Sequence, residues 1–207
     1  MKISALEQAI GRLHLCRRAL DNLEDTNRSM KTAIAHMAVF HTHWLDFLVQ
    51  WKGTYMKVQQ AAKDTPQEIQ WFGDLNNERR SDHLLRWLYE ARNDGEHGGN
   101  PSVKHSADTY RLVGPGPDGP TELSIRVAAG GGFEAVSSDG RIFPNAMVFE
   151  PGALAVQEVT ERDRNRKVPP PASHLGKPID PKPLTCAQLG YHWIAEVVQI
   201  ANAMSRP

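Results

Sequence analysis

Hydrophobic residues recur at helical spacing through the first sixty positions of the chain. From about Ser4 to Leu23 the steps are three and four residues, which predicts an amphipathic helix; the stripe consists of Leu6, Ala9, Leu13, Cys16, Leu20 and Leu23. A second stripe runs from about Asn27 to Lys63 and consists of Met30, Ile34, Met37, His41, Trp44, Leu48, Trp51, Tyr55 and Val58. Its alternating steps of four and three are typical of a seam between antiparallel helices.

Two further helices are predicted from their ends. Thr65-Pro66-Gln67-Glu68 has the pattern of a capping box with proline in the first turn, so a third helix is expected from there to about Asp94. Ser81-Asp82 is the place where this helix would break or be capped again. The last helix is expected from about Thr185 to Met204, with an apolar face made of Leu189, Trp193, Val197, Ile200 and Met204.

The pattern changes between about Asp108 and Thr160, where short β-prone runs alternate with Gly, Pro and Asp. The predicted strands are Thr109 to Val113, Leu123 to Ala128, Phe133 to Val136, Ile142 to Phe149 and Leu154 to Val159. Ser138-Asp139-Gly140 is a favourable hairpin turn, because Asp-Gly tolerates positive φ angles. These runs predict a small antiparallel meander that leans on the helices.

Together the elements predict a mainly α protein, a four-helix up-and-down bundle with a small antiparallel β insertion before the last helix. Residues 1–100 would supply three long helices and residues 101–167 the insertion. Residues 168–184 are rich in proline and are expected to form an extended linker. Residues 185–207 would complete the bundle.

The composition indicates the cellular compartment of the protein more clearly than its function. The 24 basic and 24 acidic residues balance, so binding of nucleic acid would need a local basic surface. Arg17-Arg18, Arg79-Arg80 and Arg162 through Lys167 are the candidate basic runs. Cys16 and Cys186 fall at apolar helix positions, which favours buried thiols in a reducing compartment over a disulfide. With no signal peptide and no membrane-spanning apolar run, we expect a cytoplasmic protein that does not bind membranes.

The segment from Leu84 to Gly99 carries the candidate chemistry. Arg92 extends the apolar face of Leu85 and Leu88, so its guanidinium should be partly desolvated and should need an anionic or hydrogen-bonding partner. Gly95 has the place of a helix stop, after which His97 would fold back toward Arg92.

Arg92-Asn93, three residues and then His97 resembles the signature of the HEPN superfamily. The resemblance covers roughly residues 1 to 100 and 185 to 204, and its specific part is six residues long. It implies an all-helical bundle, metal-independent cleavage of RNA, and a homodimer that joins two motifs into one site. It also implies a place in a toxin–antitoxin or defence system, with an antitoxin or regulatory protein as partner.

The residue types fit such chemistry without a cofactor or metal. Histidine can take the proton of an RNA 2′-hydroxyl, and arginine offers a charged fork that matches two phosphate oxygens. By the resemblance, the candidate catalytic residues are Arg92 and His97, then Asn93, which would bond the phosphate, orient the histidine or cap the helix. Glu96 and Asp94 would raise the pKa of the histidine or be solvated.

Three other interpretations stay open. Arg92 to Gly95 also suits an ordinary helix C-terminus, which would leave His97 in a loop. The chain could be a non-catalytic interaction or regulatory module whose β insertion binds a partner. A metal-binding bundle would use His36, His41 or His43, although the chain has no Glu-x-x-His motif. The five tryptophans fit helix faces and are expected in the core.

Overall fold

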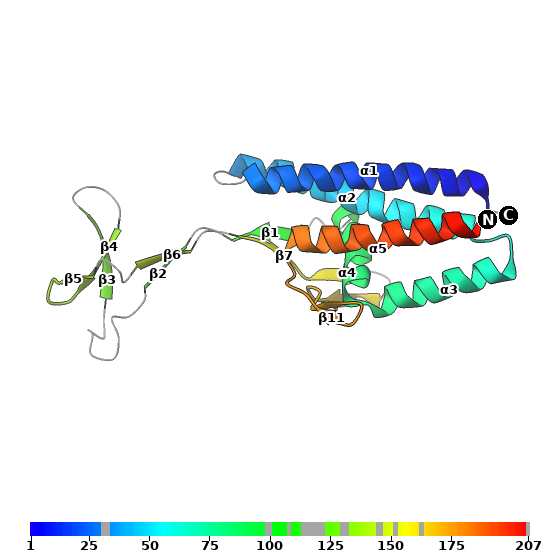
Figure 1. Ribbon diagram of the computed structural model, residues 1–207. Coiled ribbons are helices and arrows are strands. Elements are labelled where there is room, and N and C mark those ends of the chain that lie inside the picture. Colours follow the sequence, from blue (N-terminus) through cyan, green and yellow to red (C-terminus); the bar gives the residue numbers. More distant parts are fainter. Residues whose placement is uncertain are drawn as a thin grey trace. The chain divides into compact units, whose positions relative to one another are not determined.

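The computed structural model is mainly helical, with small antiparallel sheets (Figure 1). It describes residues 1–29, 34–97, 101–106, 109–112, 123–128, 133–143, 147–150, 153–161 and 164–205. The helices are α1 (Ile3–Ser29), α2 (Ile34–Ala61), α3 (Pro66–Ser81), α4 (His83–His97) and α5 (Pro183–Met204).

The strands are short, and those that the structure describes pair within five small sheets. They are β1 (Val103–His105), β2 (Thr109–Leu112), β3 (Leu123–Val127), β4 (Phe133–Ser137), β5 (Ile142–Phe143), β6 (Met147–Glu150), β7 (Leu154–Val156), β8 (Val159–Glu161), β9 (Arg166–Val168), β10 (Ser173–His174) and β11 (Lys177–Pro178). The predicted meander is confirmed only in part, as β3-β4-β5, and Gly140 takes the positive φ of +85° in the β4–β5 turn. The predicted strand from Ile142 to Phe149 contains both β5 and β6, and β6 pairs with β2, while β7 pairs with β1.

The chain divides into two compact units. The first contains residues 1–104 and 154–207, and the second contains residues 105–153. Strands β7 and β8 and the first two residues of β9 lie within the predicted insertion of residues 101–167 but belong to the helical unit. The reason is burial, because Val156, Val159 and Val168 are at most 5% exposed within the core that the helices build.

The core of the helical unit is rich in tryptophan. Helices α1, α2 and α5 run side by side, and α4 packs against α2, α3 and α5 (Figure 1). Trp44, Trp51 and Trp87 are buried, and their indole N–H groups donate to the Ser102 hydroxyl and to the carbonyls of Gly190 and Gln157 at 2.8–2.9 Å. Satisfied in this way, they are core residues as predicted and not a surface for stacking bases.

Cys16 and Cys186 are buried free thiols, which also confirms their prediction. Burial raises the pKa of Cys186 to about 12, so the thiol stays protonated and unreactive.

The boundary between the first two helices was predicted too early. Helix α1 continues to Ser29, beyond the expected end at Leu23 and start of the next helix at Asn27. Thr26 is buried on α1 and its hydroxyl donates to the Asn22 carbonyl, which extends the buried stripe by another turn. Met30 lies outside the described residues.

The predicted third helix is two helices, with Asp82 between them. Thr65 caps α3 by accepting the Glu68 amide at 3.2 Å, as expected. Asp82 has an extended backbone and closes α3 through its own N–H to the Glu78 carbonyl. Its carboxylate then accepts the Leu85 amide at 2.8 Å and so caps α4.

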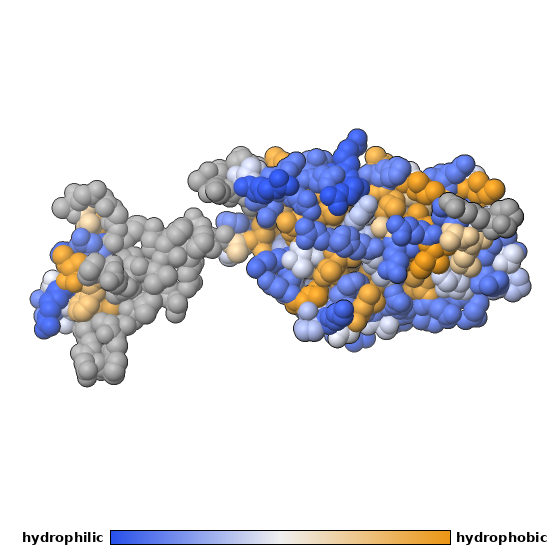
Figure 2. Space-filling view, viewed as in Figure 1, coloured by the Kyte–Doolittle hydropathy of each residue, from blue (hydrophilic) through white to orange (hydrophobic). Residues whose placement is uncertain are grey.

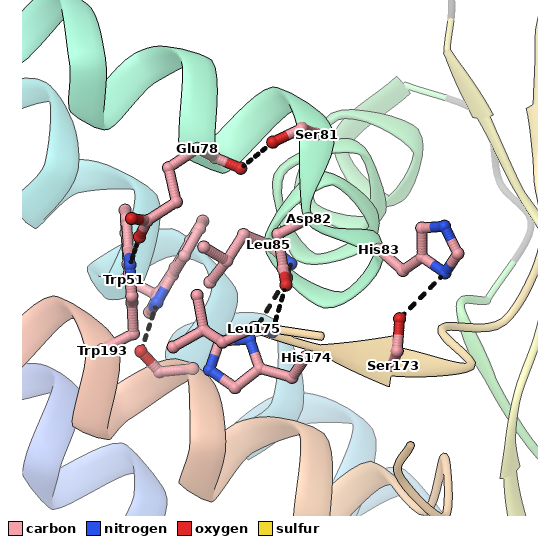
Figure 3. Close-up of polar contacts among 11 residues, drawn as sticks. Trp51, Glu78, Ser81, Asp82, His83, Leu85, Ser173, His174, Leu175 and Trp193 are labelled. Carbon is pink, nitrogen blue, oxygen red and sulfur yellow. Dashed lines mark hydrogen bonds and ion pairs between the residues drawn. The ribbon is translucent and has the colours of Figure 1, made fainter. Parts of the chain in front are cut away.

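The segment predicted as an extended linker is packed at this junction. Strands β10 and β11 form a hairpin there, and His174 in β10 is 8% exposed. Figure 3 shows the His174 ring beside Asp82. Asp82 accepts from His174 Nδ1 at 3.1 Å and from the Leu175 amide at 2.6 Å, which fixes the hairpin to the helices.

The surface of the helical unit is largely hydrophilic, with small hydrophobic patches on the face that Figure 2 shows. Among the described residues, no helix combines the length and the apolar character that crossing a bilayer requires.

Candidate functional site

Helix α4 passes through Gly95 and ends at His97, so the predicted stop at Gly95 is wrong. A Cβ on Gly95 would lie 3.0 Å from Leu45 Cδ2 of α2, tighter than ordinary contact. The glycine is therefore suited to a close approach of two helices and does not serve as a left-handed cap. The sequence pattern alone does not distinguish these two roles.

The continuous helix changes which motif positions share a face. Positions 93 and 97 are one turn apart, about 40° around the axis, whereas positions 92 and 97 differ by about 140°. Arg92 and Asn93 are both half-buried. The side chains of Glu96 and His97 lie outside the described residues. Within one subunit, the backbone thus groups Asn93 with His97 and leaves Arg92 on the flank.

Asn93 belongs to a polar network between α2 and α4. Its amide nitrogen donates to Glu90 Oε2 at 3.0 Å, and its carbonyl oxygen accepts from Lys52 Nζ. Both amide atoms are thereby oriented, and the network links a lysine to a carboxylate through the amide. An asparagine held on both sides is a fixed group, and fixed groups position substrates well.

Asp94, which was weighed as an influence on the histidine, has a structural role. It is 4% exposed, and its Oδ2 accepts the Thr160 amide of β8 at 3.1 Å. This bond ties the β8–β9 hairpin to α4.

A polar pocket of about 250 Å³ opens beside Glu90. Its lining comes from the end of α3, from α4, and from β8 and the turn after it: Arg79, Arg80, Arg86, Tyr89, Glu90, Glu161 and Arg164. Two of the three predicted basic runs, Arg79-Arg80 and Arg162 through Lys167, contribute to this lining. The pocket is therefore a local concentration of basic side chains.

Aromatic rings hold the deepest arginine. Arg79 is 6% exposed, and its guanidinium lies 4.1 Å from the centre of the Tyr89 ring. Lys52 Nζ is 4.1 Å from the centre of the same ring. Two cations on one tyrosine concentrate positive charge beside Glu90.

The two glutamates that line the pocket differ in their ion pairs and in the surroundings that set their pKa. Glu161 lies 2.6 Å from Arg86 in an ion pair and 3.7 Å from Arg164. Burial raises the pKa of Glu90 above its ordinary value, and the negative charge of Glu161 adds to this effect. The Asn93 hydrogen bond and the charges of Arg79 and Lys52 act in the opposite direction.

The candidate metal ligands do not converge. Among the described residues, no group of three His, Cys, Asp or Glu side chains is placed to hold a metal ion. His41 and His43 are half-buried on α2, and burial lowers the pKa of His41. The side chain of His36 lies outside the described residues.

Comparisons with protein-family models, with curated proteins and with solved structures find no match for this chain.

Sequence reasoning missed most of the pocket. None of Arg86, Glu90 and Glu161 is predicted as a site residue from the sequence, and Arg79 is predicted only as part of a basic run. Arg86 and Glu161 are 75 positions apart, so their pairing leaves no local signal in the sequence. The available clue was periodic: Arg86, Glu90, Asn93 and His97 follow steps of four, three and four along a polar face of α4.

Proposed function

We propose that this chain is a metal-independent, HEPN-like endoribonuclease built on a four-helix up-and-down bundle. The observation that carries the proposal is the uninterrupted α4, which puts position 97 one turn beyond Asn93 on the helix. Asn93 is itself fixed between Lys52 and Glu90. This arrangement supports an acid–base group at position 97 next to an ordered polar group and a lysine.

In the proposed reaction, His97 takes the proton from a 2′-hydroxyl of RNA, and the 2′-oxygen attacks the adjacent phosphorus. The bond from phosphorus to the 5′-oxygen breaks, and that oxygen takes a proton from water as it leaves, while His97 returns its proton to the solvent. The products are a 2′,3′-cyclic phosphate and a 5′-hydroxyl. Asn93 orients the histidine or the phosphate, and Arg92 stabilises the negative charge on the phosphoryl oxygens.

A homodimer fits the placement of Arg92. Because positions 92 and 97 are about 140° apart on the helix, one subunit does not present both side by side. A two-fold assembly would join His97 of one subunit to Arg92 of the partner subunit. The cytoplasmic setting expected from the sequence is part of this proposal, and an antitoxin or regulatory protein as partner enters it through the resemblance alone.

The test is cleavage of a mixed RNA substrate by the full chain in the presence of EDTA. Cleavage is expected with the metal chelated, and RNA with a 2′-deoxy residue at the cut position should resist. His97→Ala and Arg92→Ala should each lower the rate by at least about a hundredfold, since general acid–base groups and charge-stabilising donors contribute that much. Asn93→Ala should lower the rate less.

Matched controls separate this effect from contamination and from general charge loss. His14→Ala and Arg18→Ala remove the same residue types from exposed positions on α1 and should leave the rate unchanged. If His97→Ala cuts RNA as fast as His14→Ala does, the ribonuclease proposal is wrong.

The second candidate is a non-catalytic module that binds a protein partner through the β insertion. Apolar side chains exposed on one face of β3 favour it, with Ile125 at 48% and Val127 at 72% exposed. Exposed apolar groups that share a face are a common feature of binding surfaces. Loss of partner binding in Val127→Asp, with RNA uncut by the unaltered chain, would favour this candidate.

A further inference from the structure

The pocket beside Glu90 carries more positive than negative charge. Among the described residues, four arginines line it against two glutamates, a formal surplus of two positive charges in a space of about 250 Å³. Such a volume takes a tetrahedral anion and a small substituent, and is too small for a folded macromolecular element. The surplus matches an anion with two negative charges.

Arg79 supplies a donor without an acceptor. Its Nε is buried and, among the described residues, has no hydrogen-bond partner. The Asn76 side chain accepts only from Nη2, at 3.3 Å. Leaving a buried, charged donor unsatisfied is costly, and such groups are rare in folded proteins. An anion in the adjoining pocket is one partner that would satisfy it.

Two of the other three guanidiniums share one carboxylate. Glu161 lies near both Arg86 and Arg164, at 2.6 and 3.7 Å. Each guanidinium has five N–H donors, so one carboxylate leaves most of the donors on these two side chains available. Arg80 is exposed and borders the same pocket. Arginine forks match the paired oxygens of a phosphate group.

We propose that this pocket binds a doubly charged phosphate group, as in a phosphate monoester or in inorganic phosphate. The proposal does not depend on the ribonuclease activity, because it uses none of the motif residues Arg92, Asn93 and His97. The phosphate could come from free inorganic phosphate or from the 5′ end of an RNA, and both present the same chemistry.

Glu90 sets how tightly the anion is held. Its carboxylate lies in the same lining and repels an anion when it is ionised. The raised pKa that burial gives Glu90 makes protonation on anion binding easier. Phosphate binding should therefore be accompanied by uptake of a proton, and Glu90→Gln should bind phosphate more tightly.

The experiment is calorimetric titration of the full chain with inorganic phosphate. Arg80→Ala and Arg164→Ala should each weaken binding about tenfold, because each removes one charge-assisted contact at the rim. Arg79→Met should abolish binding, with circular dichroism to show that the variant is folded. Glu90→Gln should tighten binding, and Arg18→Gln, an exposed arginine on α1, should bind like the unaltered chain.

Two further ligands identify the source and the charge form. Dimethyl phosphate, a singly charged diester, should bind at least tenfold more weakly than inorganic phosphate; equal binding would contradict recognition of a monoester. If a 5′-phosphorylated oligoribonucleotide binds more tightly than its 5′-hydroxyl counterpart, RNA is the source, and if inorganic phosphate binds but the two oligonucleotides do not differ, the source is free phosphate. If neither inorganic phosphate nor the 5′-phosphate shows binding that Arg80→Ala weakens, the proposal is overturned.

Discussion

The carboxylate at the N-terminus of α4 and the carboxylate in its middle lie in opposite environments. Asp82 caps the helix and receives hydrogen bonds from the amides of Leu85 and Leu175 and from the His174 ring (Figure 3). Burial alone would raise the pKa of Asp82, but the hydrogen bonds from His174 and from the two amides outweigh it and lower that pKa. The charge of Asp82 therefore stabilises the fold through these hydrogen bonds.

Glu90, two turns further along, has a different environment. One hydrogen bond reaches it from Asn93, another carboxylate repels it, and its pKa is raised. Arg79 beside it keeps a buried donor without an acceptor among the described residues. Polar groups that a fold leaves unsatisfied are where ligands bind, whereas satisfied ones hold elements together. The Asp82 end of α4 therefore stabilises the fold, and the Glu90 end is the candidate for ligand binding.

The largest expected effect is at the structural end. Asp82→Ala removes the cap of α4 and leaves the Leu175 amide and the His174 ring without their acceptor. Loss of a cap and of buried hydrogen bonds should cost about 3 kcal/mol of unfolding free energy. For a chain of this size the midpoint of thermal unfolding should fall by roughly 10 °C.

Asp74→Ala is the matched control, since Asp74 is an exposed aspartate on α3. It should change the unfolding free energy by less than about 0.5 kcal/mol. If Asp82→Ala were no less stable than Asp74→Ala in urea denaturation, the hairpin would not be fixed through Asp82.

Much of the helical core and of the junction at Asp82 is predictable from the sequence. The stripe Trp44, Leu48, Trp51, Tyr55 and Val58 marks the buried face of α2 as expected. The Thr65 cap and the possible interruption at Ser81-Asp82 were also read correctly, because caps depend on residues a few positions apart. The hairpin that Asp82 fixes was not predicted, since its contacts join residues more than 90 positions apart.

The chemical end was less predictable. The motif residues are predicted by the resemblance. The predicted end of α4 at Gly95 is wrong, because the role of Gly95 depends on a contact with Leu45. The pocket joins α3, α4 and β8, so its arginines converge only in the folded chain. Tertiary contacts of this kind have no periodic signature.

A smaller effect of opposite sign is expected at Glu90. Glu90→Gln keeps an acceptor for Asn93 and removes a charge that burial makes unfavourable. The variant should be more stable than the unaltered chain by roughly 1 kcal/mol at pH 7. Urea denaturation measures this, and Glu196→Gln, an exposed glutamate on α5, serves as the control. A clearly destabilised Glu90→Gln would mean that the surrounding arginines hold Glu90 as a structural ion pair, and that the pocket is closed to ligands.

The smallest effect is the pH dependence that separates the two carboxylates. Asp82 has a lowered pKa in the folded chain, so its contribution is present above its unfolded pKa and is lost as the pH falls through its folded pKa. That window lies below about pH 4. Glu90 has a raised pKa, so stability is lost as the pH rises from about 4.3, the ordinary glutamate value, through the folded pKa. Denaturation curves of Asp82→Asn and Glu90→Gln between pH 3 and 7 should therefore diverge from the unaltered chain in opposite directions. The stability advantage of the unaltered chain over Asp82→Asn should shrink toward pH 3, while its deficit against Glu90→Gln should grow toward pH 7. Equal slopes for the two variants would show that the two carboxylates do the same work, and the division of α4 into a structural and a chemical end would fail.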